Sequence, residues 1–254
     1  MPYAPKFLKN MKIAIIGYGK MGKMIEDIAI RRGHDISCII DKDNTEDFDS
    51  EAFKNSDAAI EFTTPSTAAE NVLKCFERGV PVVCGSTGWT ERLPEMKRLC
   101  DEGKGSLLWA SNFSIGVNVF KAVSNFLADI MRNLPQYTPS MTEIHHIHKL
   151  DHPSGTALTL AEGILDRSDC LKGWTETNEP GKLNITALRE GEVPGTHIIK
   201  WNSDVDDITI THTAKSRAGF AEGAVTAAEW LAPRRGFHTI GEMMRDITHQ
   251  DIFK

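Results

Sequence analysis

A cluster of histidines beside a lysine is the part of this chain whose residue types best suit chemistry. Glu143 is followed by Ile-His-His-Ile-His-Lys, which contains His145, His146, His148 and Lys149. Side chains of an extended strand alternate between its faces, so Glu143, His145 and Lys149 should share one face. His146 and His148 should point to the other. Histidine can donate a proton near neutral pH and lysine can hold an anion, which predicts His145 and Lys149 as a catalytic pair.

The same segment runs into the expected start of a helix. Beyond Pro153, apolar residues recur at helical spacing, which places Ser154, Gly155 and Thr156 in a first helical turn. The apolar residues are Ala157, Leu160, Ala161, Ile164 and Leu165. Backbone N–H groups at a helix start have no intrahelical partners and bind anions. Together with Lys149, this turn predicts a site for a carboxylate or a phosphate.

A metal site is the other chemical interpretation of the cluster. His146 and His148 could present two imidazoles, and Glu143 or Asp151 could add an oxygen ligand. Lys149 argues against this, because its ammonium would repel a divalent cation. The sequence also contains no Cys-x-x-Cys or His-Glu-x-x-His pattern. We therefore predict no metal.

A glycine-rich turn near the start of the chain is typical of dinucleotide binding. An apolar strand from Lys12 ends in Gly17-x-Gly19-x-x-Gly22, and a helix with apolar spacing follows. A second strand then delivers Asp41, about twenty residues beyond the glycines. Glycines permit a tight turn and a close approach to a pyrophosphate, although a purely structural glycine turn is the alternative.

The alternation of strands and helices continues through the first half of the chain. Strands are predicted at residues 35–40, 58–62, 80–84 and 106–110, and helices at 67–78 and 94–102. Successive units of this kind predict an α/β fold with a Rossmann-type, doubly wound parallel sheet. Ligands bind beyond the carboxyl ends of such strands, so loops 63–66, 85–88 and 111–114 should line the cofactor.

The pattern changes after a predicted helix at residues 116–132. Strand-like stretches at 184–189, 197–202 and 208–214 are joined by hairpin-like turns, which predicts a smaller α+β domain with antiparallel character. Residues 208–213 alternate as a half-buried strand would. Helices at 221–231 and 240–247 should return to the first domain. We expect a dinucleotide-binding domain at 1–114 and 217–254, and a substrate-binding and oligomerisation domain at 115–216.

The bulk composition narrows the class of protein. The 254 residues are 41% hydrophobic and carry a formal net charge of -6 without a long basic run, which disfavours nucleic acid or an anionic membrane as partner. No apolar stretch is long enough to span a bilayer and no signal peptide is evident, so we expect a cytoplasmic protein. The five cysteines lack paired spacing, which predicts reduced thiols. Residues 1–10 look like an extension with little structural role.

These motifs together resemble the 4-hydroxy-tetrahydrodipicolinate reductase family, whose members act in lysine and diaminopimelate biosynthesis. The most specific motif is Glu-x-His-His-x-x-Lys-x-Asp-x-Pro-Ser-Gly-Thr-Ala, present from Glu143 to Ala157. Further matches are Asn-Phe-Ser-x-Gly-Val-Asn from Asn112, Gly-x-Thr-Gly from Gly85, and Lys-Ser-Arg from Lys215. The resemblance covers the chain from Met11 onward. It implies an NADH- or NADPH-dependent oxidoreductase, typically a homotetramer, that acts on a small cyclic dicarboxylate.

The resemblance also implies roles for individual residues. His145 would be the acid or base of the reduction and Lys149 a proton donor or carboxylate anchor beside it. The substrate carboxylates would be held by His146 and the turn of Ser154, Gly155 and Thr156. The residues expected around the dinucleotide are Gly17, Tyr18, Gly19, Lys20, Met21, Gly22, Asp41, Lys42, Gly85, Ser86, Thr87, Ala110, Ser111, Asn112 and Phe113.

This chain departs from the common family pattern around the adenosine ribose. The glycine turn is one residue shorter, Asp41 is followed by Lys42 where an arginine often follows the acid, and Thr64 stands where an arginine often occurs. These changes leave the preference between NADH and NADPH open. Two other functions stay open at this stage. One is a metal-dependent hydrolase or lyase that uses the histidines, and the other is a non-catalytic dinucleotide sensor.

Overall fold

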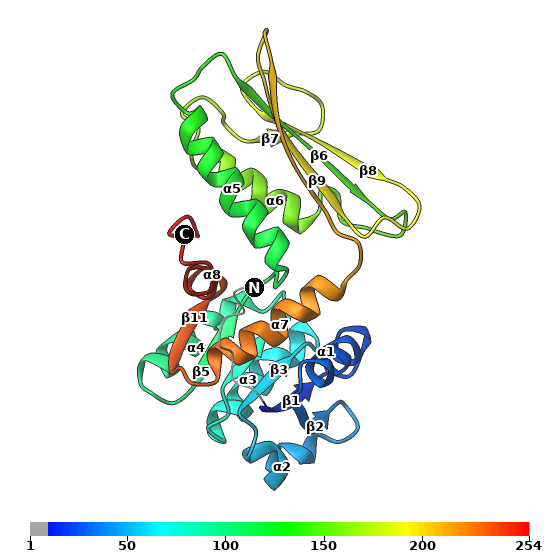
Figure 1. Ribbon diagram of the computed structural model, residues 1–254, viewed down its shortest axis with the longest axis vertical. Helices are drawn as coiled ribbons and strands as arrows, with labels where there is room; N and C mark the ends of the chain where they lie inside the picture. Colours follow the sequence, from blue (N-terminus) through cyan, green and yellow to red (C-terminus); the bar gives the residue numbers. More distant parts are fainter. Residues whose placement is uncertain (1–9, 254) are drawn as a thin grey trace. The chain divides into compact units, whose positions relative to one another are not determined.

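The computed structural model describes residues 10–253, which form two compact units (Figure 1). The first unit comprises residues up to 115 and residues 218–251, and the second comprises residues 116–217 with Ile252 and Phe253. The predicted extension at residues 1–10 lies outside the described residues except for Asn10. Each unit has its own sheet and its own hydrophobic core.

The first unit is built on a six-stranded sheet in the order β11-β5-β4-β3-β1-β2, and all of its paired strands are parallel. The strands are β1 (Lys12–Ile16), β2 (Asp35–Ile40), β3 (Ala58–Glu61), β4 (Val82–Cys84), β5 (Ser106–Trp109) and β11 (Gly236–Thr239). Every residue of β1 after Lys12 is buried, as expected for a strand covered on both faces. The predicted α/β class with a doubly wound sheet is confirmed.

Helices flank this sheet and cover its apolar faces. They are α1 (Lys20–Arg31), α2 (Glu51–Lys54), α3 (Pro65–Glu77), α4 (Leu93–Asp101), α7 (Ala218–Leu231) and α8 (Ile240–Thr248), with short 3-10 turns at Thr45–Asp49 and Thr90–Arg92. The chain crosses from β1 to β2 in one direction and from β3 to β4 in the other, so right-handed crossovers place α1 and α3 on opposite faces. The helices α7 and α8, near the end of the chain, belong to this unit.

The second unit packs two helices against a five-stranded sheet in the order β10-β9-β6-β8-β7. The helices are α5 (Ile115–Met131) and α6 (Gly155–Leu165), and the strands are β6 (Thr138–His145), β7 (Trp174–Thr175), β8 (Leu183–Arg189), β9 (Thr196–Asn202) and β10 (Asp207–Thr213). Met141, Ile185 and Ile199 point from neighbouring strands into the core beneath these helices. The sheet thereby fixes the end of β6, where the histidine cluster begins.

Three details of the sheets differ from the sequence expectation. The second sheet is mixed, because β8 pairs in parallel with both β6 and β7. Strand β10 is an edge strand that is mostly exposed rather than half-buried, and its Ile208 faces solvent. The short strand β11 was not expected, because four residues carry too little periodicity to separate a strand from a turn.

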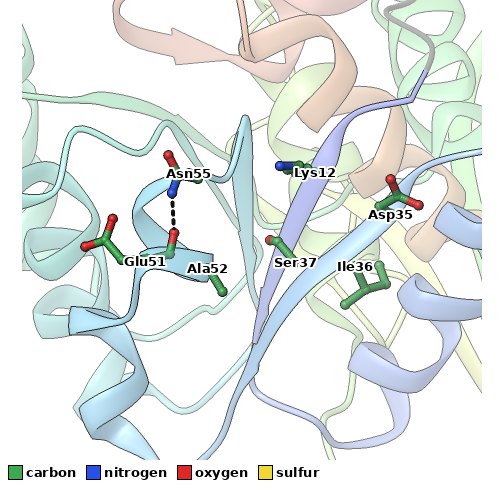
Figure 2. A pocket seen from close by; sticks show the side chains of 7 residues that line it. All are labelled: Lys12, Asp35, Ile36, Ser37, Glu51, Ala52 and Asn55. Carbon is green, nitrogen blue, oxygen red and sulfur yellow. Dashed lines mark hydrogen bonds between the residues drawn. The ribbon is translucent and has the colours of Figure 1, made fainter.

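Further observations limit where function can lie. All five cysteines are free, as predicted. Among the described residues, no helix is both long and apolar enough to cross a membrane. Figure 2 shows a hollow lined by residues of β1, β2 and α2, among them Lys12, Asp35 and Glu51. Because Lys12 and Asp35 begin their strands, this hollow is at the edge opposite to the glycine turn.

Candidate active site

The predicted dinucleotide residues of the first unit gather at the carboxyl edge of its parallel sheet. The glycine turn follows β1, Asp41 follows β2, Gly85 follows β4 and Ala110 follows β5. Parallel strands bring these ends to one side of the sheet, which is where such folds bind ligands. The arrangement therefore fits a dinucleotide.

The three glycines of the turn differ in why a side chain is absent. Gly17 has φ +91°, and a Cβ added there would lie 2.2 Å from the carbonyl oxygen of Phe62. A Cβ at Gly22 would lie 2.2 Å from the oxygen of Gly17, so the helix α1 can approach the turn only without a side chain. A Cβ at Gly19 meets nothing within 4 Å. The open space at the start of α1 is where a pyrophosphate would approach the backbone.

The residues around this turn add specific contacts. The hydroxyl of Tyr18 donates to the carboxylate of Glu26, which ties the turn to α1. Lys20 and Met21 are the first residues of that helix, and Lys20 is exposed. An exposed lysine at a helix start suits a phosphate.

Asp41, the acid after β2, is exposed, and hydrogen bonds within its own loop hold it in place. The N–H of Asp41 donates to Asn44 Oδ1 at 2.7 Å, and Asp41 Oδ1 accepts the N–H of Lys42 at 2.9 Å. The ammonium of Lys42 lies 3.9 Å from Asp43, so its charge is partly balanced by that carboxylate. The side chain of Lys42 is almost fully exposed, so it offers little fixed positive charge.

The loops after β3 and β4 are locked together through Ser86. Its hydroxyl oxygen accepts the N–H of Thr63 at 2.8 Å, and its carbonyl accepts the indole N–H groups of Trp89 and Trp109 at 2.8 and 3.0 Å. Thr63 also donates its N–H and its hydroxyl to the fully buried Glu61, which sequence reasoning did not select. Ser86 is thus a structural centre of the predicted cofactor edge.

The remaining predicted cofactor residues flank this centre. Thr87 and Ser111 are exposed, whereas Ala110 and Phe113 are buried. Asn112 Oδ1 accepts the N–H of Ser114 at 2.9 Å, which shapes the loop after β5. The exposed hydroxyls are the groups of this set that are available to a ligand.

In the second unit, strand alternation accounts for the position of His145 but not for that of Lys149, the other member of the predicted catalytic pair. Glu143 and His145 share the buried face of β6, and Glu143 Oε2 lies 3.0 Å from His145 Nδ1. The strand ends at His145, so the predicted alternation of His146, His148 and Lys149 is wrong. The backbone turns instead, with the N–H of Lys149 donating to the carbonyl of His146 at 3.1 Å.

Lys149 is directed to the start of α6 by a different route. Its Nζ lies 2.6 and 2.8 Å from the two carboxylate oxygens of Asp151, and Asp151 Oδ2 accepts the N–H of Gly155 at 3.3 Å. Ser154 is the N-cap of α6, and its hydroxyl accepts the N–H of Ala157 at 3.1 Å. Lys149 and the helix start therefore hold the chain's own Asp151 carboxylate between them.

The other predicted substrate residues are His146 and Thr156. His146 is partly buried, and its Nδ1 is enclosed without a hydrogen-bond partner among the described residues. Its ring centre lies 6.1 Å from that of the exposed His148. Thr156 is partly exposed in the first turn of α6.

Sequence reasoning missed three residues that complete the site. Arg189, at the end of β8, lies 3.2 Å from Glu143 Oε1, and His197, on β9, packs edge-on against His145 with ring centres 5.2 Å apart. Gly195 lies so close that a Cβ there would be 3.0 Å from His145 Nε2. These residues are 44 to 52 positions from His145, so only the pairing of β6 with β8 and β9 reveals them.

Burial and charge set the protonation states in this cluster. Burial raises the pKa of Glu143, but His145 and the N–H and hydroxyl of Ser154 outweigh it and lower this pKa to about 2. Burial lowers the pKa of His197 to about 4, assisted by the neighbouring His145 and opposed by Glu143. At neutral pH Glu143 is therefore an anion and His197 is neutral.

Of the metal ligands considered from the sequence, Glu143 belongs to the group of potential ligands that the described residues form, whereas His146, His148 and Asp151 do not. Glu143, His145 and His197 offer ligand atoms within 4.8 Å of one another. The guanidinium of Arg189 binds the same carboxylate through its other oxygen, and a second cation beside it would be repelled. An ionised carboxylate next to an imidazole instead suits proton transfer.

Comparison with known proteins agrees with this two-part organisation. The family model described as dihydrodipicolinate reductase, N-terminus, matches residues 11–113, and the model for its C-terminus matches residues 116–244. The 4-hydroxy-tetrahydrodipicolinate reductase of Christiangramia forsetii is 44% identical over 93% of this chain and 99% of its own length. The reductase of the same name from Archaeoglobus fulgidus is 33% identical over 91% of this chain and 83% of its length.

Solved structures support the fold. A dipicolinate-bound dihydrodipicolinate reductase from Paenisporosarcina sp. TG-14 superposes with a TM-score of 0.76 at 21% identity, covering 91% of this chain and 97% of the other. An engineered D-amino acid dehydrogenase bound to NADP+ is more distant, with a TM-score of 0.54 at 14% identity, covering 96% of this chain and all of the other. Because the family models follow the chain through both units and a relative that spans nearly all of it is 44% identical, this protein belongs to the dihydrodipicolinate reductase family.

Proposed function

We propose that this protein reduces 4-hydroxy-tetrahydrodipicolinate to tetrahydrodipicolinate with NADH or NADPH, in lysine and diaminopimelate biosynthesis. The names of the relatives support this activity. The observation that carries it in the structure is the carboxylate of Asp151, which Lys149 and the N-terminus of α6 bind together. A group that already binds a carboxylate suits a dicarboxylate substrate.

The first unit would hold the dinucleotide. Gly17, Gly19 and Gly22 leave its pyrophosphate room at the start of α1, and Asp41 is exposed where the adenosine ribose would lie. The loops of Ser86, Thr87 and residues 110–113 would line the remainder. When bound, the reduced nicotinamide supplies the hydride.

The second unit would hold the substrate and supply a proton. Lys149 and the backbone of Gly155 and Thr156 would bind one carboxylate, exchanging it for that of Asp151, and His146 would contact the substrate beside them. The Lys149–Asp151 contact is partly exposed, and such pairs contribute only about 0–1 kcal/mol, so the exchange costs little. His145 would donate the proton that the substrate carbon requires after hydride addition, with loss of the hydroxyl as water.

The assembly and location are part of the same proposal. We propose a cytoplasmic homotetramer that forms through the sheet of the second unit, as the family resemblance implies. Helices α5 and α6 cover one face of this sheet. Leu188 on β8 exposes an apolar side chain on the other face, which a partner subunit would cover. Light scattering should give four times the mass of the chain.

A coupled assay with freshly generated 4-hydroxy-tetrahydrodipicolinate tests the activity, by following the loss of reduced nicotinamide absorbance. We expect turnover with the purified protein and competitive inhibition by planar pyridine dicarboxylates. Binding of NADH without turnover would favour a dinucleotide sensor instead. Stoichiometric zinc together with hydrolysis or elimination would favour the metal-dependent alternative.

A further inference from the structure

Glu143 is a buried charge for which the proposed reaction has no direct use. Its side chain is fully buried on β6, three strands contribute groups that face it, and no part of it is available to a substrate. Burying a carboxylate is costly unless its oxygens are well matched by donors or cations. Because burial of this carboxylate is costly, we expect a role in which its negative charge is needed.

The two oxygens of Glu143 have different partners. Oε1 accepts the N–H of Ser154 at 3.0 Å and lies 3.2 and 3.3 Å from the two terminal nitrogens of Arg189. Oε2 faces His145 Nδ1 at 3.0 Å and His197 Nε2 at 3.9 Å. One oxygen is thus fixed by the protein frame, and the other is directed at the two imidazoles.

The frame that fixes the first oxygen is the substrate-binding turn itself. Arg189 also donates to the carbonyl oxygens of Asp151, at 2.6 Å, and of Lys149, at 3.4 Å. Ser154 is the N-cap of α6. Glu143 cannot turn away from His145 without releasing Arg189 and the start of the helix, so its position is rigidly set.

The two imidazoles that face Oε2 have different surroundings. Burial keeps His197 neutral, and its Nε2 also lies 3.4 Å from the hydroxyl of Ser154. His145 Nδ1 and Glu143 Oε2 are both buried, neither meets a hydrogen-bond partner with full geometry among the described residues, and they face each other at 3.0 Å. An Nδ1 that faces a carboxylate at 3.0 Å carries the hydrogen, because two acceptors would repel each other.

The other ring nitrogen of His145, Nε2, is the one that can donate a proton to a substrate. This nitrogen faces Gly195, and a methyl group on that residue would approach it to 3.0 Å. The absence of a side chain at position 195, whose φ is +153°, leaves room for this side of the ring. The geometry is that of a carboxylate–histidine pair in which the anion fixes the tautomer.

We propose that Glu143 is a positioning residue that holds the Nδ1 hydrogen of His145 and so assigns proton donation to Nε2. The inference rests on the proposed role of His145. During donation the Nε2–H bond breaks, the proton forms a bond to the substrate carbon, and the imidazolium becomes a neutral ring with its hydrogen on Nδ1. The anion beside Nδ1 stabilises the charged form before transfer. Arg189 and His197 are further cationic or titratable groups beside this pair, and Lys149 and His212 act on His197 in turn.

The test compares Glu143→Gln and Glu143→Asp with the wild type. For Glu143→Gln we expect kcat to fall by about a hundredfold or more, with the KM for NADH unchanged. The alkaline limb of the kcat–pH profile should move to lower pH, because the imidazolium has lost its anion. Glu143→Asp restores the charge and should recover part of kcat. A purely structural role would not move the pH limb.

A second measurement does not depend on how the variants fold. Nitrogen-15 NMR of the wild type, with His145 assigned by comparison with His145→Gln, should show the Nδ1–H tautomer when the ring is neutral. The Nε2–H tautomer, or a Glu143→Gln enzyme with normal kcat and an unmoved pH limb, would overturn the inference. If His145→Gln is inactive while Glu143→Gln is normal, only this inference fails. If His145→Gln is itself active, the proposed role of His145 fails.

Discussion

The candidate cofactor edge of the first unit is formed mainly by backbone and glycines, whereas the histidine cluster of the second unit is formed mainly by side chains. At the cofactor edge, the backbone and the lack of side chains at glycines shape the site. Gly17 and Gly22 allow neighbouring backbone segments to approach closely, and Gly19 leaves open space. In the cluster, side chains from β6, β8 and β9 and the backbone N–H of Ser154 converge on Glu143. Changes in the first unit should therefore affect cofactor binding, and changes in the second should affect proton transfer and substrate binding.

The largest effect is expected from His145→Gln. Loss of a positioned proton donor typically lowers turnover by about 10²- to 10⁴-fold, and substrate affinity should change little. Steady-state kinetics checks this, with His148→Gln as a matched control because His148 is exposed on the adjoining loop. Near-normal kcat in His145→Gln would remove this residue from the mechanism.

The next effect concerns stability rather than activity. The pKa of His197 lies at about 4 in the folded protein, below its ordinary value of 6.5, so protonation opposes folding. The contribution of neutral His197 to the free energy of unfolding is fully present above about pH 6.5. It is lost as the pH falls toward 4, and the total loss is about 3 kcal/mol. Urea unfolding of the wild type and His197→Gln at several pH values measures this. Identical slopes with pH in both proteins would contradict the assigned burial of a neutral His197.

Lys149→Ala should weaken substrate binding and turnover together. A carboxylate that loses this partner loses a charge-assisted hydrogen bond worth about 1.5–3 kcal/mol. The inhibition constant of a planar pyridine dicarboxylate reports the loss, and Lys182→Ala serves as control because that lysine pairs with Glu179 on the surface. Equal inhibitor affinity in wild type and Lys149→Ala would show that Lys149 does not anchor the carboxylate.

Two glycine variants separate fold from cofactor binding in the first unit. Gly22→Ala places a methyl 2.2 Å from the oxygen of Gly17 and should destabilise by about 1–3 kcal/mol, the usual cost of overpacking. Gly19→Ala meets nothing within 4 Å, so its melting temperature should stay close to that of the wild type while the KM for NADH rises. A destabilised Gly19→Ala with an unchanged KM would reverse this division.

The smallest effect is the preference between cofactors. Asp41 can accept hydrogen bonds from the ribose hydroxyls, and Lys42 is too exposed and flexible to offset its repulsion of a 2′-phosphate fully. We expect NADH to be used at least as well as NADPH, with Asp41→Ala shifted toward NADPH. Catalytic efficiencies with both cofactors at two salt concentrations test this. A wild-type preference for NADPH of more than about a hundredfold, roughly 2.7 kcal/mol, would contradict the role of Asp41.

The same contrast explains what could be predicted from the sequence. The parallel sheet and its glycine turn follow from local patterns, because strand, turn and helix are consecutive in the chain. The helix start after Pro153 was likewise predictable from local spacing, although Ser154 is the N-cap and the helix begins at Gly155. By contrast, the predicted strand alternation beyond His145 was wrong, because the chain forms a turn there. The carbonyl oxygens of Gly191 and His146 accept the N–H groups of Ile147 and Lys149 in this turn. Arg189, Gly195 and His197 reach the cluster only through strand pairing, which one sequence does not specify.

The most direct test of the account is an isotope measurement that follows both units in one turnover. The protein would reduce fresh 4-hydroxy-tetrahydrodipicolinate with NADH that carries deuterium at the transferred position, in ordinary water, and mass spectrometry would examine the product. We predict one deuterium in tetrahydrodipicolinate at the new carbon–hydrogen bond, with the second hydrogen taken from solvent, and a rate that falls strongly in His145→Gln. A product without deuterium, or no product while NADH remains bound, would contradict a reductase that joins a dinucleotide site to a histidine proton donor.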